Sequence, residues 1–409
     1  MIQPESEAVD WSARADEAAR SVTHRFGRKL LFLPGTHLAA TTWPWGRFGH
    51  VTQPWHYWWQ AHYLDALVDA GRRELDRGAT PEARFDGPGN PSAGRLASRL
   101  LRGIRIRNLL TFVNNYFDDM AWLALASLRL DGLAADASKR GRRRYAKVQR
   151  SLNPQFISAS TDDLGGGTFW SSKRDFKNTP ATAPVALYFA RTGQQARAQA
   201  LVDWLDATLF DDERGLYLDG ARLGSDGKIL VEANVYTYNQ GPILGALLEL
   251  GGQRNLERAA QVIAAVERHL TVEAPAKGTD TLETPAAKVL RCDGTGDRGL
   301  FTGILCRYLA LAAKDQRLPE ASRRTAGRLV QATAEAFWAG SSSSAGVSGS
   351  PTGGSADSRD GSPYGRVFAI HATNTAAEDY PPGAAVELST QLQAWMAIEA
   401  AATLARAAR

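Results

Sequence analysis

The sequence predicts an all-α protein built as a closed ring of six helical hairpins. Apolar residues recur at helical spacing through most of the chain, and strand-like runs are few and short. A helical solenoid would show a fixed sequence repeat of roughly 30–45 residues, and none is present. Residues 1–409 are therefore expected to form one domain.

Twelve segments show the apolar spacing of amphipathic helices. In one of them Trp122, Leu123, Ala126 and Leu130 share a face. The predicted helices are 6–25, 55–77, 95–108, 119–131, 138–150, 178–193, 195–209, 240–252, 254–270, 297–315, 317–338 and 388–407.

One short β-hairpin is predicted among the helices. Residues 215–219 and 228–232 have the composition of strands, and Asp226-Gly227 between them favours a tight turn.

Three long loops, at 33–54, 153–177 and 340–382, are candidate places for a functional site. The Gly- and Ser-rich stretch at about 340–363 is expected to be a flexible surface loop. It is not interpreted as a domain boundary, because only the helix 388–407 follows it.

Composition excludes several classes of protein. Apolar residues make up 44% of the 409 residues and charged residues 22%, which excludes a chain disordered throughout. The net charge of 48 − 43 = +5 does not by itself indicate a nucleic-acid partner. The two cysteines, Cys292 and Cys306, exclude a disulfide scaffold and are interpreted as free thiols.

Targeting signals are also absent from the sequence as it stands. No stretch approaches eighteen uninterrupted apolar residues, so no membrane span is predicted. The acidic start lacks the features of a signal peptide, which predicts a cytoplasmic protein, or a secreted one if a leader was trimmed.

A basic run at 139–150 is the strongest charge feature. It is interpreted as a solvated helix face, with an anionic glycan or a phospholipid headgroup as the functional alternative and nucleic acid as a third reading.

The adjacent carboxylates Asp118 and Asp119 are the first candidate for chemistry. An acidic pair where a helix begins can serve as a simple cap. Here Tyr116, Phe117 and Trp122 surround the pair, and aromatic rings suit sugar binding. Two close carboxylates cannot both ionise easily, so one can hold a proton near neutrality, as a retaining glycosidase requires.

Two other acidic pairs serve as comparison. Asp211-Asp212 is interpreted as a solvated turn, whereas Asp162-Asp163 precedes a triglycine segment, 165–167, whose backbone could approach a ligand closely.

Two further segments place polar and aromatic residues before or within an apolar helix, 236–240 and 55–65. Asn239 or Gln240 could be either a helix cap or a ligand contact. His56 and His62 are six residues apart, unlike the four-residue spacing of paired zinc ligands, so no metal or other cofactor is predicted. A nucleophile elbow for Ser-His-Asp catalysis is also missing.

Together these segments resemble glycoside hydrolase family 76, the α-1,6-mannanases. Tyr116-Phe-Asp-Asp-Met-Ala-Trp is similar to the family's Asp-Asp signature. The segments 58–66, 165–178, 237–241 and 296–309 are similar to further family blocks in the same order. Phe117 stands where Tyr is common and Thr302 where Lys is usual.

The resemblance implies an (α/α)6 barrel and metal-independent, retaining hydrolysis of α-1,6-mannosidic linkages in mannan or in mannose-containing cell-envelope glycans. It implies that Asp118 is the nucleophile and Asp119 the general acid/base. The substrate-binding residues predicted with them are Asn115, Tyr116, Trp122, Gly166, Gly167, Trp170, Asn178, Tyr238, Asn239, Gln240, Trp58 and Asp297.

The protein is expected to be a monomer. Its expected ligand is α-mannan or a manno-oligosaccharide, and an anionic lipid-linked mannan is a further candidate. The alternatives are a catalytically silent glycan-binding protein or a transglycosylase on the same fold. An epimerase or unsaturated-sugar hydrolase would need a differently built site. The Asp pair, the triglycine loop and the segment 236–240 are predicted to converge, with Trp170 and Tyr238 near the carboxylates.

Overall fold

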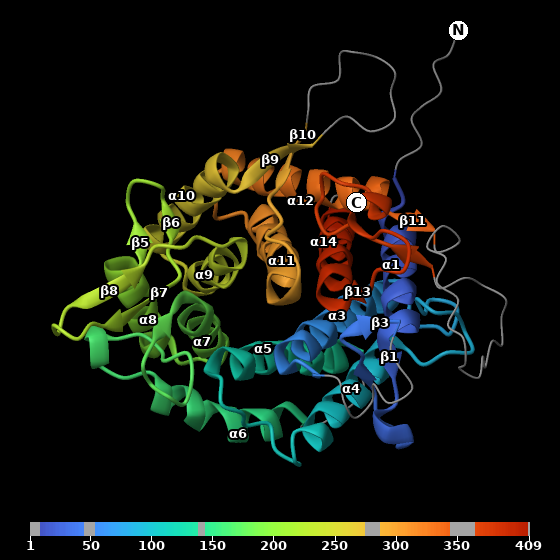
Figure 1. The fold of residues 1–409 in the computed structure, drawn as a ribbon, viewed down its shortest axis with the longest axis horizontal. Helices are drawn as coiled ribbons and strands as arrows, with labels where there is room; N and C mark the ends of the chain where they lie inside the picture. The colour runs from blue at the N-terminus through green and yellow to red at the C-terminus, as the bar shows by residue number, and fades with distance from the viewer. Residues whose placement is uncertain (1–8, 45–53, 138–143, 275–286, 344–364, 408–409) are drawn as a thin grey trace, which may run out of the picture.

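The computed structural model describes residues 9–44, 54–137, 144–274, 287–343 and 365–407, and these are mostly helical (Figure 1). Each of the twelve predicted helices has a counterpart in the structure. The acidic start, most of the Gly- and Ser-rich stretch at 340–363 and the beginning of the basic run lie outside the described residues.

Six helices contact one another in cyclic order. α3 contacts α5, which contacts α7, and the series continues through α9, α11 and α14, which returns to α3. Figure 1 shows these six around the centre of the molecule. Their bounds are α3 Tyr57–Asp76, α5 Phe117–Asp136, α7 Thr179–Arg191, α9 Thr237–Leu250, α11 Phe301–Lys314 and α14 Leu388–Ala407.

A second set of helices packs outside this ring. α1 contacts α14, α4 contacts α3, α6 contacts α5, α8 contacts α7, α10 contacts α9, and α12 contacts both α11 and α14. Their bounds are α1 Trp11–Phe26, α4 Ala93–Arg107, α6 Arg144–Ala159, α8 Gln195–Thr208, α10 Gln253–His269 and α12 Glu320–Gly340. The inner helices α7, α9 and α14 bury nearly their whole lengths, as apolar sequences without a polar stripe should.

Short helices and strands connect these elements. The further helical segments are η1 Leu30–Phe32, η2 Asp163–Gly165, η3 Gly296–Leu300 and α13 Ala376–Asp379. The strands form small antiparallel ladders. One ladder has three strands, in which β7 Gly220–Leu223 pairs with both β4 Lys177–Asn178 and β8 Ile229–Glu232. The two-stranded pairs are β1 Gly27–Arg28 with β2 Leu38–Ala39, β3 Thr42–Trp43 with β13 Val386–Glu387, β5 Phe210–Asp211 with β6 Leu216–Tyr217, β9 Thr271–Ala274 with β10 Ala287–Leu290, and β11 Ser342–Ser343 with β12 Arg366–Val367.

The predicted hairpin is present, but its first strand was placed wrongly. β7, not 215–219, pairs with β8, in a register that opposes Gly220 to Glu232. Leu216 and Tyr217 instead pair back onto β5, which removes them from the hairpin. The tight turn falls at Gly227 as predicted, with φ +77°.

The helix predicted at 138–150 reaches further toward the C-terminus than expected. α6 continues to Ala159 with Pro154 inside it, so the loop expected from residue 153 begins only after the helix. Leu152 and Phe156 are fully buried on either side of the proline. Their burial outweighs the lost backbone hydrogen bond that makes proline unfavourable within a helix.

A buried set of four charged residues ties three inner helices together. Arg307 on α11 pairs with Asp65 at 2.9 Å and with Asp69 at 2.8 Å, both on α3. Arg129 on α5 contacts the same two carboxylates. Burial opposes ionisation of Asp69, but the charges of Arg129 and Arg307 outweigh it and lower its pKa to about 2.

Breaking this set should destabilise the fold. Arg307→Met removes one of the two cations that pair with Asp65 and Asp69. We therefore expect the free energy of unfolding to fall by about 3–5 kcal/mol near neutral pH. Because the pKa of Asp69 is depressed, its contribution is present above its unfolded pKa and lost as pH falls through about 2. Denaturant unfolding at pH 7 and pH 3 measures both effects. Exposed Arg197→Met is the control, and an equal loss in the two variants would contradict the account.

No helix in the described part of the chain is long and apolar enough to cross a membrane.

Candidate active site

The first residues of three inner helices meet at one end of the ring. The Tyr238 ring at the start of α9 stacks on Phe301 of α11 with centroids 3.7 Å apart. It lies 6.5 Å from the ring of Trp58 at the start of α3. Since α3 and α9 are not neighbours in the ring, this contact spans its centre.

Asp118 and Asp119 occupy the first turn of α5, and the segment before the helix holds them there. Asn114 Oδ1 accepts the backbone N–H of Tyr116 at 3.0 Å, and Asn114 Nδ2 donates to Asp119 Oδ2 at 2.7 Å. One asparagine thus shapes the chain into the helix and also fixes a carboxylate. The pair is not a cap, because the helix begins at Phe117 and no side chain caps it.

The loop that follows α6 brings Trp170 to the same carboxylates. The backbone N–H of Phe117 donates to the Trp170 carbonyl at 2.8 Å. Trp170 Nε1 donates to Asp118 Oδ2 at 3.1 Å. The rings of Tyr116 and Trp170 lie 5.1 Å apart, and the two residues are 41% and 37% exposed. They form an open aromatic surface beside the acidic pair.

Burial raises the pKa of both carboxyls. It raises the pKa of Asp118 to about 7, against the hydrogen bonds from Trp170 and from backbone N–H groups, and the negative charge of Asp297 adds to the rise. Burial also raises the pKa of Asp119, and the charge of Asp118 raises it further. Both carboxyls therefore hold a proton more readily than an exposed aspartate does.

A third carboxyl faces the same region. Asp219, between β6 and β7, accepts from Asn239 Nδ2 at 3.2 Å. Burial raises the pKa of Asp219 to about 6. Burial also raises the pKa of the Tyr238 hydroxyl, and the charges of Asp219 and Asp118 add to it, so Tyr238 lies near both.

Asp297 in η3 connects the acidic pair to α3. Its Oδ1 accepts the indole N–H groups of Trp58 and Trp59, each at 2.9 Å. The carboxylate thus orients Trp58, whose ring packs near Tyr238.

The structure brings together most of the predicted site residues, but some of the predicted side chains make contacts within the protein. Asp118, Asp119, Tyr116, Trp170, Tyr238, Asn239, Trp58 and Asp297 surround one region, and Asn115 is exposed beside it, its carbonyl accepting from Ser172 N–H at 2.9 Å.

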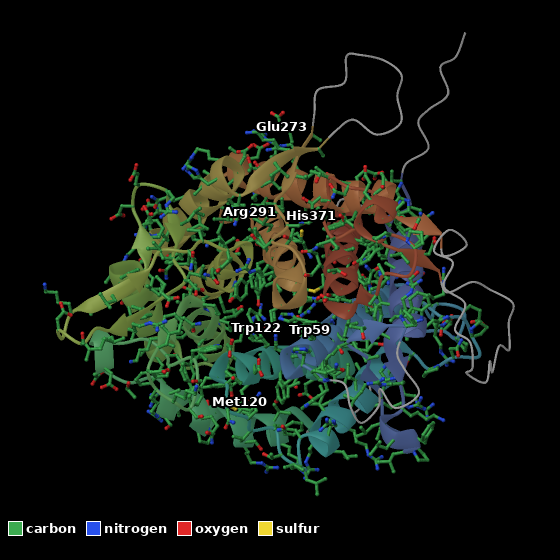
Figure 2. The ribbon with its side chains drawn as sticks, viewed as in Figure 1. Trp59, Met120, Trp122, Glu273, Arg291 and His371 are labelled. Carbon is green, nitrogen blue, oxygen red and sulfur yellow. The ribbon has the colours of Figure 1, made fainter. Side chains whose placement is uncertain are left out.

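Two side chains predicted to contact substrate, Gln240 and Trp122, are buried within the protein. The Gln240 amide accepts from Tyr217 N–H at 3.0 Å and donates to the Tyr217 carbonyl at 2.9 Å, with no exposed surface. Trp122 is 4% exposed and packs against His62, and Figure 2 places it on α5 toward the centre of the ring.

Asn178 and the triglycine loop also differ from expectation. Asn178 Oδ1 caps α7 by accepting from Ala181 N–H at 3.1 Å. Gly166 and Gly167, at φ +138° and +77°, do bring backbone close to an aromatic group, but that group is Trp204 of α8. A Cβ at either position would clash with the Trp204 ring, so packing against Trp204 requires glycine at both positions.

Lys177 is a functional residue that the sequence did not single out. Its Nζ is buried and donates to the carbonyls of Thr161, Asp163 and Gly166 at 2.6–2.7 Å. These bonds hold the loop that carries Trp170. Burial lowers the pKa of Lys177 to about 8.

We expect Lys177→Met to lower the free energy of unfolding by about 1–3 kcal/mol, because three half-buried carbonyls lose their donor. Catalytic turnover on a glycan substrate should fall with it as Trp170 loosens. Lys173→Met, at an exposed lysine four residues earlier, is the control for thermal unfolding and kinetics. Wild-type stability and turnover in Lys177→Met would refute this role.

Asp219 and Asn114 were not predicted as site residues either. Asn114 could have been found from its position just before the acidic pair, whereas Asp219 ends a strand-like run and carries no local signal. Within the described ranges, no group of three or more His, Cys, Asp or Glu side chains is arranged to hold a metal ion.

The comparison with known families agrees with this geometry. Residues 35–378 match the model of glycosyl hydrolase family 76. Adjacent carboxyls beside exposed aromatic rings suit the binding of a sugar. The match covers most of the chain, which belongs to glycosyl hydrolase family 76. No curated protein sequence matches the chain significantly.

Solved structures with the same fold include members of that family. A family 76 α-1,6-mannanase from Salegentibacter sp. HEL1_6 is 27% identical, with a TM-score of 0.71 over 97% of this chain and 100% of that one. An inactive variant of that enzyme in complex with α-1,6-mannotriose is 26% identical, with the same TM-score and coverage. A family 76 mannosidase from Bacteroides thetaiotaomicron is 17% identical, with a TM-score of 0.71 over 98% of this chain and 100% of that one.

Proposed function

We propose that this chain is a retaining, metal-independent glycoside hydrolase that cleaves α-1,6-mannosidic linkages on an (α/α)6 barrel. The observation that carries the proposal is the position of Asp118 and Asp119 side by side in the first turn of α5, where Trp170 Nε1 donates to Asp118 Oδ2 at 3.1 Å. The α-1,6-mannanase similar to this chain, and its complex with α-1,6-mannotriose, support the linkage. The cyclic contacts of six inner helices and the outer set of six support the barrel.

The two carboxyls differ in their surroundings, and this assigns their roles. Asp118 accepts from Trp170 Nε1 and from backbone N–H groups, which favour its ionised form. Its Oδ1 is buried and has no hydrogen-bond partner among the described residues. Asp119, whose pKa the charge of Asp118 raises, keeps its proton for the leaving group.

The reaction follows from these assignments. Asp118 attacks the anomeric carbon of the mannose, and the bond from that carbon to the leaving oxygen breaks as Asp119 delivers its proton to the oxygen. A water then attacks the same carbon, gives its proton to Asp119, and releases Asp118 as a carboxylate. Two displacements at one carbon return the original α configuration.

Aromatic rings near the pair suit an oligosaccharide. Tyr116 and Trp170 offer exposed rings beside Asp118, and the rings of Trp58 and Tyr238 lie 6.5 Å apart at the same end of the helical ring. Sugar rings pack their apolar faces on such side chains. Asn239 Oδ1, buried and without a hydrogen-bond partner in the described part of the chain, can accept from a mannose hydroxyl.

The pH dependence of activity tests the roles assigned to the two carboxyls. Asp118 must be ionised and Asp119 protonated, so kcat/KM should follow a bell, with an acid limb set by Asp118 and an alkaline limb set by Asp119. The charge of Asp297 raises the pKa of both groups. Asp297→Asn, which keeps an oxygen for Trp58 and Trp59, should therefore shift both limbs to lower pH. If both limbs of the kcat/KM profile are unchanged in Asp297→Asn, the charge of Asp297 does not act on the two carboxyls.

The substrate is tested by incubating the protein with mannobioses linked α-1,2, α-1,3 and α-1,6 and with an α-1,6-linked mannan. We expect release of new reducing ends from the α-1,6-linked substrates alone. Calorimetric binding of the mannan without any reducing-end release over long incubation would contradict hydrolysis and favour a silent glycan-binding protein.

A further inference from the structure

A cavity of about 810 Å³ lies away from the acidic pair, between α3, α4, α5 and the loop that joins α3 to α4. Its wall includes the second half of α5, from Ser127 to Ala137, whereas Asp118 stands at the start of that helix. The rise of an α-helix places Asp131 roughly 20 Å along the axis from Asp118. The cavity is therefore separate from the site described above.

Three arginines on one face of α4 line this cavity. Arg95, Arg99 and Arg102 are spaced by four and three residues, which aligns them on a helix. Within the described residues, none of their guanidinium groups makes a hydrogen bond or an ion pair. Arg84, also in the wall, differs in that it donates to the carbonyls of Pro88 and Asn90.

The acidic groups of the wall do not balance these charges. Glu74 is buried and accepts the backbone N–H groups of Phe85 and Ala93 at 3.2 and 3.1 Å. Burial raises the pKa of Glu74, and it also raises the pKa of Asp131. Four arginines and two acidic residues line the wall, so the cavity carries an excess of positive charge.

A second observation indicates a ligand. Ser127 lines the cavity and is 2% exposed, and its hydroxyl has no hydrogen-bond partner in the part of the chain that the structure describes. A buried polar group normally has a partner, so this hydroxyl requires one from outside the protein.

We propose that this cavity binds a small phosphate ester, with Arg95, Arg99 and Arg102 holding the phosphoryl group. Guanidinium groups bind phosphate oxygens through paired, charge-assisted hydrogen bonds. The volume lies within the range of small-ligand sites, and Leu101, Leu130 and Leu133 supply an apolar wall for the body of the ester. The Ser127 hydroxyl donates to an ester or phosphoryl oxygen.

Calorimetric titration of the full chain at low ionic strength tests this site. The probes are sn-glycerol 3-phosphate, inorganic phosphate and, as a neutral control, glycerol. We expect the ester to bind and glycerol not to bind. The triple variant Arg95→Gln, Arg99→Gln, Arg102→Gln should weaken ester binding at least about tenfold, given the strength of such contacts, and leave activity on the glycan substrate unchanged.

The matched control is the triple variant Arg197→Gln, Arg268→Gln, Lys314→Gln, which removes the same charge from exposed positions outside the cavity. It should bind the ester as the wild type does. Arg99→Gln alone, with its folding checked by thermal unfolding, replaces the cavity triple if that variant does not fold.

The outcomes separate the possible sources of the phosphoryl group. If inorganic phosphate binds as tightly as the ester, the site is supported, and the phosphoryl group alone is sufficient for binding. The proposal is overturned if the two triple variants lose ester binding equally, or if neither the ester nor inorganic phosphate binds to the wild type. Binding to anionic phospholipid vesicles without binding of the soluble phosphates also overturns it.

Discussion

Asp118→Asn is expected to lower kcat/KM on α-1,6-linked manno-oligosaccharides by about 10⁴-fold or more, as losses of catalytic nucleophiles do. The amide keeps an oxygen that can accept from Trp170 Nε1. The fold should therefore persist, whereas an uncharged amide cannot form the covalent bond to the anomeric carbon. Initial rates with reducing-end detection measure the loss, and thermal unfolding checks the fold.

The control is Asp212→Asn, an exposed aspartate in a second Asp-Asp pair far along the chain. Its activity should equal that of the wild type. Asp118→Asn with more than a tenth of wild-type activity would show that Asp118 is not the nucleophile.

Asp119→Asn should lower the rate on natural oligosaccharides by about 10²–10⁴-fold, the usual contribution of a general acid. The size of the loss should depend on the leaving group. A dinitrophenyl α-mannoside needs no proton to depart, so its first step should remain fast in Asp119→Asn and appear as a burst.

The same aryl substrate separates the two carboxyls. Asp118→Asn should lose activity on the aryl mannoside as fully as on the oligosaccharide, because its defect lies in bond formation. Added azide, which attacks without a general base, should restore turnover in Asp119→Asn. A rescue seen in Asp118→Asn with retained configuration would reverse the two assignments.

Much of the fold could be predicted from helical periodicity, because long apolar stripes tolerate errors of a few residues. The failures arose where tertiary packing overrode a local signal. The loop was predicted to begin at residue 153, but buried Leu152 and Phe156 continue the helix past Pro154. The composition of Leu216 and Tyr217 favours a strand but does not determine which strand they pair with. In the folded chain they pair with β5.

The site was predicted to the extent that it lies at loop-to-helix junctions. Asp118 and Trp170 meet as expected, because each stands near a junction at the same end of the ring. Asn239 and Gln240 show the limit of this reasoning. Neighbours on a helix point about 100° apart, so one amide faces Asp219 and the other is buried against Tyr217.

Other parts of the site have no local pattern at all. Asp219 becomes a site residue only through the contacts of β7 with β4 and of Asn239 with its carboxyl. Lys177 supports Trp170 through carbonyls of residues 161–166, which a sequence cannot place around an ammonium group.

The configuration of the first product tests the central proposal most directly. The protein is incubated with α-1,6-mannotetraose, and the anomeric protons of the released sugar are followed by NMR before mutarotation. Retaining hydrolysis through Asp118 predicts that the new reducing end appears first as the α-anomer and then drifts toward equilibrium. Initial appearance of the β-anomer would contradict the account, because it would require one direct displacement by water and no covalent role for Asp118.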